Sequence, residues 1–146
     1  MTRVDFHILP ATGKIERDRY VCKLAAKAVR QGHRVFLHAP TAEAAARLDD
    51  LLWTFRDTAF LPHRRAGDPD EDGVRVVIGH DETAPDEHDV MINLDHPTPA
   101  FFSRFERVVE VVPHDPSERA AARERYRFYQ ERGYPLTKHD IDSDHD

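Results

Sequence analysis

The sequence predicts an α/β fold, in which a mostly parallel central sheet is flanked by helices within a single domain over 1–136. Short apolar runs typical of strands alternate along the chain with segments of helical period, as strands and crossover helices do. Two of these runs, 74–78 and 89–94, are almost continuously apolar, which is typical of strands covered on both faces. With 146 residues, one domain can bury a core without disulfides or a structural metal.

The first half of the chain predicts strands and helices in alternation. Residues 3–9 alternate apolar with polar side chains, which indicates a strand. Helical spacing extends over 16–30, and Gly32 follows where a left-handed C-terminal cap is needed. We expect a second strand over 34–38 and then a second helix, which Thr41 can cap.

The second half continues the alternation less regularly. A polar loop rich in acidic residues, Pro and Gly is expected over 64–73, before the two apolar strands. Between those strands the sequence shows no apolar period. Residues 98–106 predict a short helix or turn, and 107–112 predict the last strand.

The final helix has the clearest boundaries. Asp115 can accept hydrogen bonds from the first turn, Pro116 suits the first helical position, and Glu118 completes the spacing of a capping box. Gly133 is expected to end the helix. The residues over 137–146 are polar and acidic, so we expect a disordered tail there.

Composition excludes several classes of protein. The single cysteine, Cys22, lies in a helical pattern, so neither a disulfide framework nor a Cys-based zinc site is expected, and a reducing cytoplasm fits best. No apolar run is long enough for a signal peptide or a membrane span. A net charge of -6 argues against broad, non-specific binding to nucleic acid.

Motifs for catalysis are weak or absent. Gly13 and Lys14 suggest a phosphate-binding loop, but the motif requires a glycine where Ile8 stands and Ser or Thr where Ile15 stands. The ten histidines are scattered without a His-x-x-x-His pair, so no metal site is predicted. No Ser-His-Asp or Cys-His arrangement is recognisable. We therefore expect no catalytic residues and no cofactor.

The final helix carries a row of basic side chains. Arg119, Arg123 and Arg127 recur every four residues and so share one face, with Tyr126 beside them. Guanidinium groups beside an aromatic ring suit an acidic peptide or a carboxylate end. On spacing alone a solvated face, with nearby glutamates as ion-pair partners, is the commoner outcome, and binding to a nucleic-acid backbone is a rival function.

A second candidate surface lies where the second helix ends. Leu48, Leu51 and Leu52 fall on the core face, whereas Trp53 is rotated towards its edge, and Phe60 follows in the next loop. Aromatic residues in such a place either fix a loop to the core or anchor a partner. The sequence pattern leaves both interpretations open.

Three segments together resemble the chi subunit family of bacterial DNA polymerase III. They are 47–63 (RLDDLLWTFRDTAFLPH), 92–112 (which includes FFSRFERVVEVV) and 122–136 (ARERYRFYQERGYPL). The resemblance extends from the first strand to Leu136, and the tail and the 64–73 loop depart from it. The family implies a Rossmann-like α/β accessory subunit without catalytic activity or a phosphate-binding loop.

The resemblance also implies partners and site residues. The family pairs with a psi subunit in the clamp-loader assembly and binds the acidic C-terminal tail of single-stranded DNA-binding protein, so contact with DNA is indirect. The implied site for that tail consists of Val112, Arg119, Arg123, Tyr126 and Arg127, with Arg123 as the main carboxylate partner. The implied surface for psi, or for a helicase that uses the same face, consists of Trp53, Phe60, Pro62 and His63.

The resemblance therefore predicts a cytoplasmic replication adaptor that is a monomer or a heterodimer. Two alternatives from other classes stay open at this level. One is a nucleotide-dependent enzyme of the same fold, and the other is a module that binds single-stranded DNA directly. The second is less favoured because only Tyr126 accompanies the arginine row, whereas strand binders interleave several stacking side chains.

Overall fold

A computed structural model describes residues 1–10, 16–54, 61–69, 73–83 and 85–141 of the chain. These residues form a seven-stranded sheet in the order β3-β4-β2-β5-β6-β1-β7, and each neighbouring pair is parallel. The strands are β1 (Arg3–Ile8), β2 (Val35–His38), β3 (His63–Arg65), β4 (Val76–Gly79), β5 (Val90–Asn93), β6 (Arg107–Val112) and β7 (Leu136–Asp140). The helices are α1 (Arg17–Arg30), α2 (Ala42–Thr54), α3 (Pro116–Glu131) and the short 3-10 helix η2 (Ala100–Arg104). The predicted α/β fold is confirmed.

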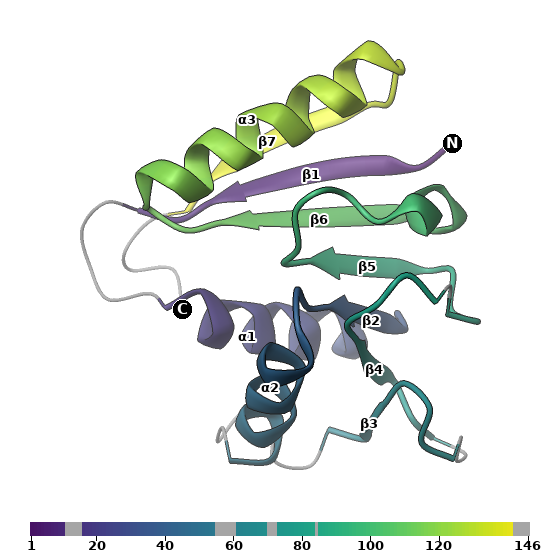
Figure 1. Ribbon diagram of the computed structural model, residues 1–146. Coiled ribbons are helices and arrows are strands. Elements are labelled where there is room, and N and C mark those ends of the chain that lie inside the picture. The colour runs from purple at the N-terminus through teal and green to yellow at the C-terminus, as the bar shows by residue number, and fades with distance from the viewer. Residues whose placement is uncertain (11–15, 55–60, 70–72, 84, 142–146) are drawn as a thin grey trace.

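Helices cover both faces of the sheet (Figure 1), and each face has its own core. On one face, α1 and α2 pack with Leu37, Ile78 and Ile92, which are almost completely buried. On the other face, α3 and η2 pack with Phe6, Phe36 and the neighbouring side chains. Central strands are buried on both faces, which explains why their sequences are continuously apolar.

The predicted helix ends are confirmed. The Asp115 carboxylate accepts a hydrogen bond from the Glu118 N–H at 3.0 Å, and Thr41 accepts one from the Ala44 N–H at 3.1 Å. The Ser117 hydroxyl and the Glu118 N–H both donate to Asp115 and lower the pKa of its carboxyl below the ordinary value. Gly133 follows α3 with φ of 77°, the left-handed region that glycine adopts at little cost.

Two edge strands correct the sequence predictions. The expected loop over 64–73 begins inside β3, which pairs with β4, and the expected disordered tail over 137–146 begins inside β7, which pairs with β1. Both strands are short, and β7 is mostly exposed. Each edge strand is held by backbone hydrogen bonds to one neighbouring strand. Such a strand can form without alternating apolar and polar side chains, so the sequence shows no strand pattern there. Residues 142–146 of the expected tail lie outside the described residues.

No helix within the described ranges is long and apolar enough to cross a membrane.

Candidate functional site

A cavity of about 460 Å³ lies between α3 and the strands β1, β6 and β7. The basic row predicted on the last helix forms one wall of this cavity, and the strands form the other. All the residues expected to bind the acidic tail line it, together with six that the sequence did not single out. The lining residues are Phe6, Ile8, Val112, Arg119, Ala122, Arg123, Tyr126, Arg127, Gln130, Lys138 and Asp140.

The floor of the cavity is apolar. Phe6 and Val112 are 2% and 1% exposed, and the half-buried Tyr126 ring meets Phe6 edge to face, with the ring centroids 5.3 Å apart. Aromatic pairs in this arrangement add to the stability that burial alone gives. Tyr126 is thus held as a firm apolar surface beside the arginine row.

The three arginines of the row differ in exposure and in their hydrogen-bond partners. Arg119 is half-buried, and its Nη2 donates to the backbone oxygen of Leu9 at 3.5 Å, which fixes one edge of its guanidinium group. Arg123 and Arg127 are exposed and form no ion pair with a carboxylate in the described parts of the chain. Glu124, one of the glutamates expected as a partner, instead lies 3.3 Å from His96 Nε2. The row therefore presents positive charge to solvent at the mouth of the cavity.

Lys138 adds a fourth positive charge that sequence analysis missed. It lies on β7, and its Nζ is 5.1 Å from the centroid of the Tyr126 ring, within the range of a cation–π contact. Asp140, two residues further along the same strand, is the acidic residue of the lining. Because this segment was expected to be a disordered tail and not a strand, the sequence did not predict that either residue lies at this site.

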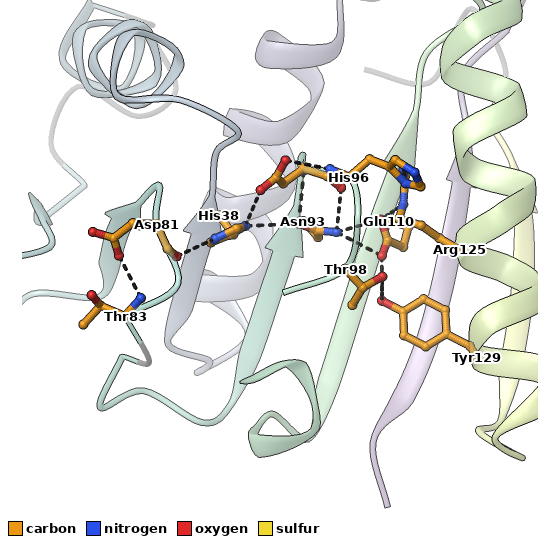
Figure 2. A network of polar contacts seen from close by, with 10 residues as sticks. His38, Asp81, Thr83, Asn93, His96, Thr98, Glu110, Arg125 and Tyr129 are labelled. Carbon is orange, nitrogen blue, oxygen red and sulfur yellow. Dashed lines mark hydrogen bonds and ion pairs between the residues drawn. The ribbon is translucent and has the colours of Figure 1, made fainter. Parts of the chain in front are cut away.

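The inner face of α3 carries a buried ion pair (Figure 2). Arg125 Nε donates to Glu110 Oε1 at 2.9 Å, and the two side chains are 5% and 0% exposed. Tyr129 donates its hydroxyl to Glu110 Oε2 at 2.6 Å, and Asn93 Nδ2 donates to both carboxylate oxygens. Burial and the negative Glu110 raise the pKa of Tyr129 well above that of a free tyrosine.

These contacts fix the rotation of α3. The buried residues of the helix are Ala122, Arg125 and Tyr129. Its sequence surroundings predict an exposed side chain for Arg125, whereas in the fold its charge is paired with the carboxylate of Glu110 on a buried strand. With Arg125 held inward, the row of Arg119, Arg123 and Arg127 must face the cavity.

The polar network continues from Glu110 towards the carboxyl end of β2. His38 is buried, with Nδ1 3.3 Å from Asn93 Oδ1 and Nε2 3.0 Å from the backbone oxygen of Asp81 (Figure 2). Such a position in a parallel sheet often holds catalytic groups. Here the polar atoms bond to one another across β2, β5 and β6, so the network connects the sheet to α3.

The second predicted surface lies at the end of α2. Trp53 is 59% exposed, and its ring packs on that of His63 with the centroids 4.6 Å apart. The His63 side chain is completely covered, and its Nε2 lies 3.2 Å from Asp49 Oδ1, although outside hydrogen-bond geometry. Pro62 is exposed, and Phe60 lies outside the described residues. Trp53 and Pro62 thus present apolar surface to solvent, and the buried His63 ring packs against the Trp53 ring.

Metal-binding geometry is absent from the part of the chain that the structure describes. No group of three His, Cys, Asp or Glu side chains there could hold a metal ion. Cys22 is buried in α1, where burial raises the pKa of its thiol to about 12. Gly13 and Lys14, of the rejected phosphate-loop interpretation, fall outside the described residues.

Known proteins similar to this chain agree on one family. The profile of the family described as DNA polymerase III chi subunit, HolC, matches residues 1–137. DNA polymerase III subunit chi of Pseudomonas aeruginosa is 42% identical over 139 residues, which span 95% of this chain and 96% of that protein. DNA polymerase III subunit chi of Escherichia coli is 33% identical over 120 residues, which span 82% of each chain.

Among solved structures, the crystal structure of T4 UvsW is similar with a TM-score of 0.67. The match covers 97% of this chain but 42% of the UvsW chain, at 9% sequence identity. At that identity the likeness concerns the fold alone.

Proposed function

The chain belongs to the DNA polymerase III chi subunit family, and on this premise we propose that it is a non-catalytic adaptor of the replication machinery. Membership of the family gives it an accessory role in replication. We propose further that it binds the acidic C-terminal tail of single-stranded DNA-binding protein in the cavity beneath α3. It acts in the bacterial cytoplasm, where the replisome works, and its contact with DNA is indirect.

One observation carries the proposal for the tail. Val112, Arg119, Arg123, Tyr126 and Arg127, which the sequence resemblance singles out, line one cavity although they come from two elements. Exposed guanidinium groups at the rim suit carboxylates, and the half-buried apolar lining of Ile8 and Tyr126 suits an aromatic or aliphatic side chain of a peptide. The cavity thus offers cations for the carboxylates of an acidic peptide and apolar surface for a neighbouring side chain.

A psi-type subunit is the proposed partner at the other surface. Trp53 is the large hydrophobic side chain most exposed after Met1 in the described chain, and Pro62 lies exposed near it. Exposed tryptophans at the edge of an element are frequent anchors of protein interfaces. A helicase that uses the same face would compete with psi for this surface.

A titration with three ligands tests the tail proposal against its rivals. We expect a fluorescent peptide copying the acidic tail to bind, and to bind more weakly as salt screens the charges at the rim. A bare single-stranded oligonucleotide of similar length should bind more weakly than the peptide, and millimolar ATP should leave the melting temperature unchanged. Tighter binding of the oligonucleotide, or no binding of the peptide, would contradict the proposal.

A further inference from the structure

The outer edge of β7 is the end of the sheet beside the cavity. β7 pairs with β1 on one side and has no neighbour on its other side among the described residues. Its residues are exposed apart from the half-buried Leu136. An unpaired strand edge offers backbone N–H and C=O groups to any extended peptide.

The register of β7 shows which backbone groups face outward. The Val4 N–H donates to the Pro135 oxygen at 3.0 Å, and the Ile141 N–H donates to the Ile8 oxygen at 2.9 Å. In a parallel ladder, successive residues direct their N–H and C=O alternately towards a neighbour and away from it. Since Pro135 and Ile141 face β1, the backbone groups of Lys138 and Asp140 face outward.

Side chains of β7 alternate between two cavities. Lys138 and Asp140 line the cavity beneath α3, whereas His139 and Ile141, the residue after β7, line one of about 720 Å³ on the α1 face. The α1 cavity also carries cationic side chains: Lys23, Lys27, Arg30 and Arg107. Its acidic residue, Asp5, lies 3.5 Å from Arg107 and 3.6 Å from His139 and so is already balanced.

We propose that the acidic peptide adds to the outer edge of β7 as an eighth strand, with its side chains alternating between the two basic cavities. The inference rests on the proposed function and extends it by stating how the peptide is held. A strand that bears carboxylates at successive positions directs them alternately to the two faces of the sheet. Both faces next to β7 carry cations. The edge therefore favours a peptide with acidic residues at successive positions over one in which acidic and uncharged residues alternate.

Proline at position 138 tests the backbone contact directly. Lys138→Pro removes the outward N–H but leaves the pairing with β1, since proline is tolerated at a strand edge whose N–H faces solvent. Lys138→Ala is the matched control, because it removes the same charge and cation–π contact but keeps the N–H. We expect Lys138→Pro to bind the acidic peptide about fivefold more weakly than Lys138→Ala, the value of about one hydrogen bond.

A scan of the peptide provides a second measurement that needs no variant of the protein. N-methylation of each peptide amide in turn should weaken binding to the wild-type chain at every second position, because only alternate amides face β7. Equal affinity of the two Lys138 variants together with an N-methyl scan without a period of two would overturn the strand addition. Should Lys138→Pro fail to fold, as circular dichroism would show, the scan alone decides.

The two proposals fail in different ways. If the wild-type chain does not bind the peptide at all, the proposed function is wrong. If it binds and Arg123→Ala weakens binding, but neither the Lys138 pair nor the scan shows the expected effect, the cavity site stands and the strand addition alone is wrong.

Discussion

At the scale of single residues, α3 shows how arginines of one helix take opposite roles. Arg123 lies exposed at the mouth of the cavity, whereas Arg125, two positions on, is 5% exposed and paired with Glu110. Two positions correspond to about 200° around a helix, so neighbours of the same type face opposite sides. Their functions follow from this geometry, since one presents charge and the other fixes the orientation of the helix.

Removal of the buried arginine should therefore destabilise the whole fold. Arg125→Met leaves the Glu110 carboxylate buried without its cation, and we expect a loss of about 3–5 kcal/mol in the free energy of unfolding. Urea unfolding followed by circular dichroism measures this loss. The matched control is Arg123→Met, which should stay within about 0.5 kcal/mol of the wild type. A loss below about 1 kcal/mol for Arg125→Met would show that the pair does not hold α3.

The roles of these arginines were only partly predictable. Spacing alone placed Arg119, Arg123 and Arg127 on one face, because helical phase is set by the backbone. Spacing did not predict the burial of Arg125, because that burial depends on pairing with Glu110. Glu110 lies on another element of the fold, as a single polar residue in an apolar strand. Long-range pairing of charges leaves no local pattern.

At the scale of elements, the strands and helices differ in how far the sequence predicts them. The central strands β2, β4 and β5 are buried, so their apolar runs are evident. The ends of α3 follow from Asp115 and Gly133, whose chemistry is local. The edge strands β3 and β7 were not predicted. Because β7 was not predicted, Lys138 was not expected to line the cavity.

The end of α2 carries the prediction for the second partner. Trp53→Ala removes the exposed ring that packs on His63, and we expect the affinity for a psi-type subunit to fall by about 2 kcal/mol or more, as at an interface anchor. A pull-down of purified psi-type subunit by the tagged chain measures this change. The same variant should bind the acidic peptide as the wild type does, which serves as the control for folding. Undiminished capture of psi would exclude Trp53 as the anchor.

At the scale of the whole molecule, the two proposed partner surfaces lie on separate elements. The end of α2 belongs to the layer of helices opposite α3, and the sheet lies between the two layers (Figure 1). Substitutions at distant sites that share no partners have nearly additive effects. We therefore expect the chain to hold both proposed partners at once, because their proposed surfaces lie on opposite sides of the sheet.

Net charge also acts at this scale. The chain carries a formal charge of -6, so its net charge repels an acidic peptide, whereas the cationic side chains of the two cavities beside β7 attract it locally. Such an arrangement favours binding at one place over non-specific adhesion to acidic polymers. It also explains why a bare oligonucleotide should be a poor ligand despite the basic cavity.

The affinity of the acidic tail peptide for Arg123→Ala, measured by isothermal titration calorimetry beside the wild type, tests the central claim most directly. Arg47→Ala, an exposed arginine of α2, is the matched control. Loss of a charge-assisted hydrogen bond predicts binding weaker by about 1.5–3 kcal/mol for Arg123→Ala, or about ten- to a hundredfold, with Arg47→Ala unchanged. Equal affinity of wild type and Arg123→Ala would contradict the claim that the cavity beneath α3 binds the tail.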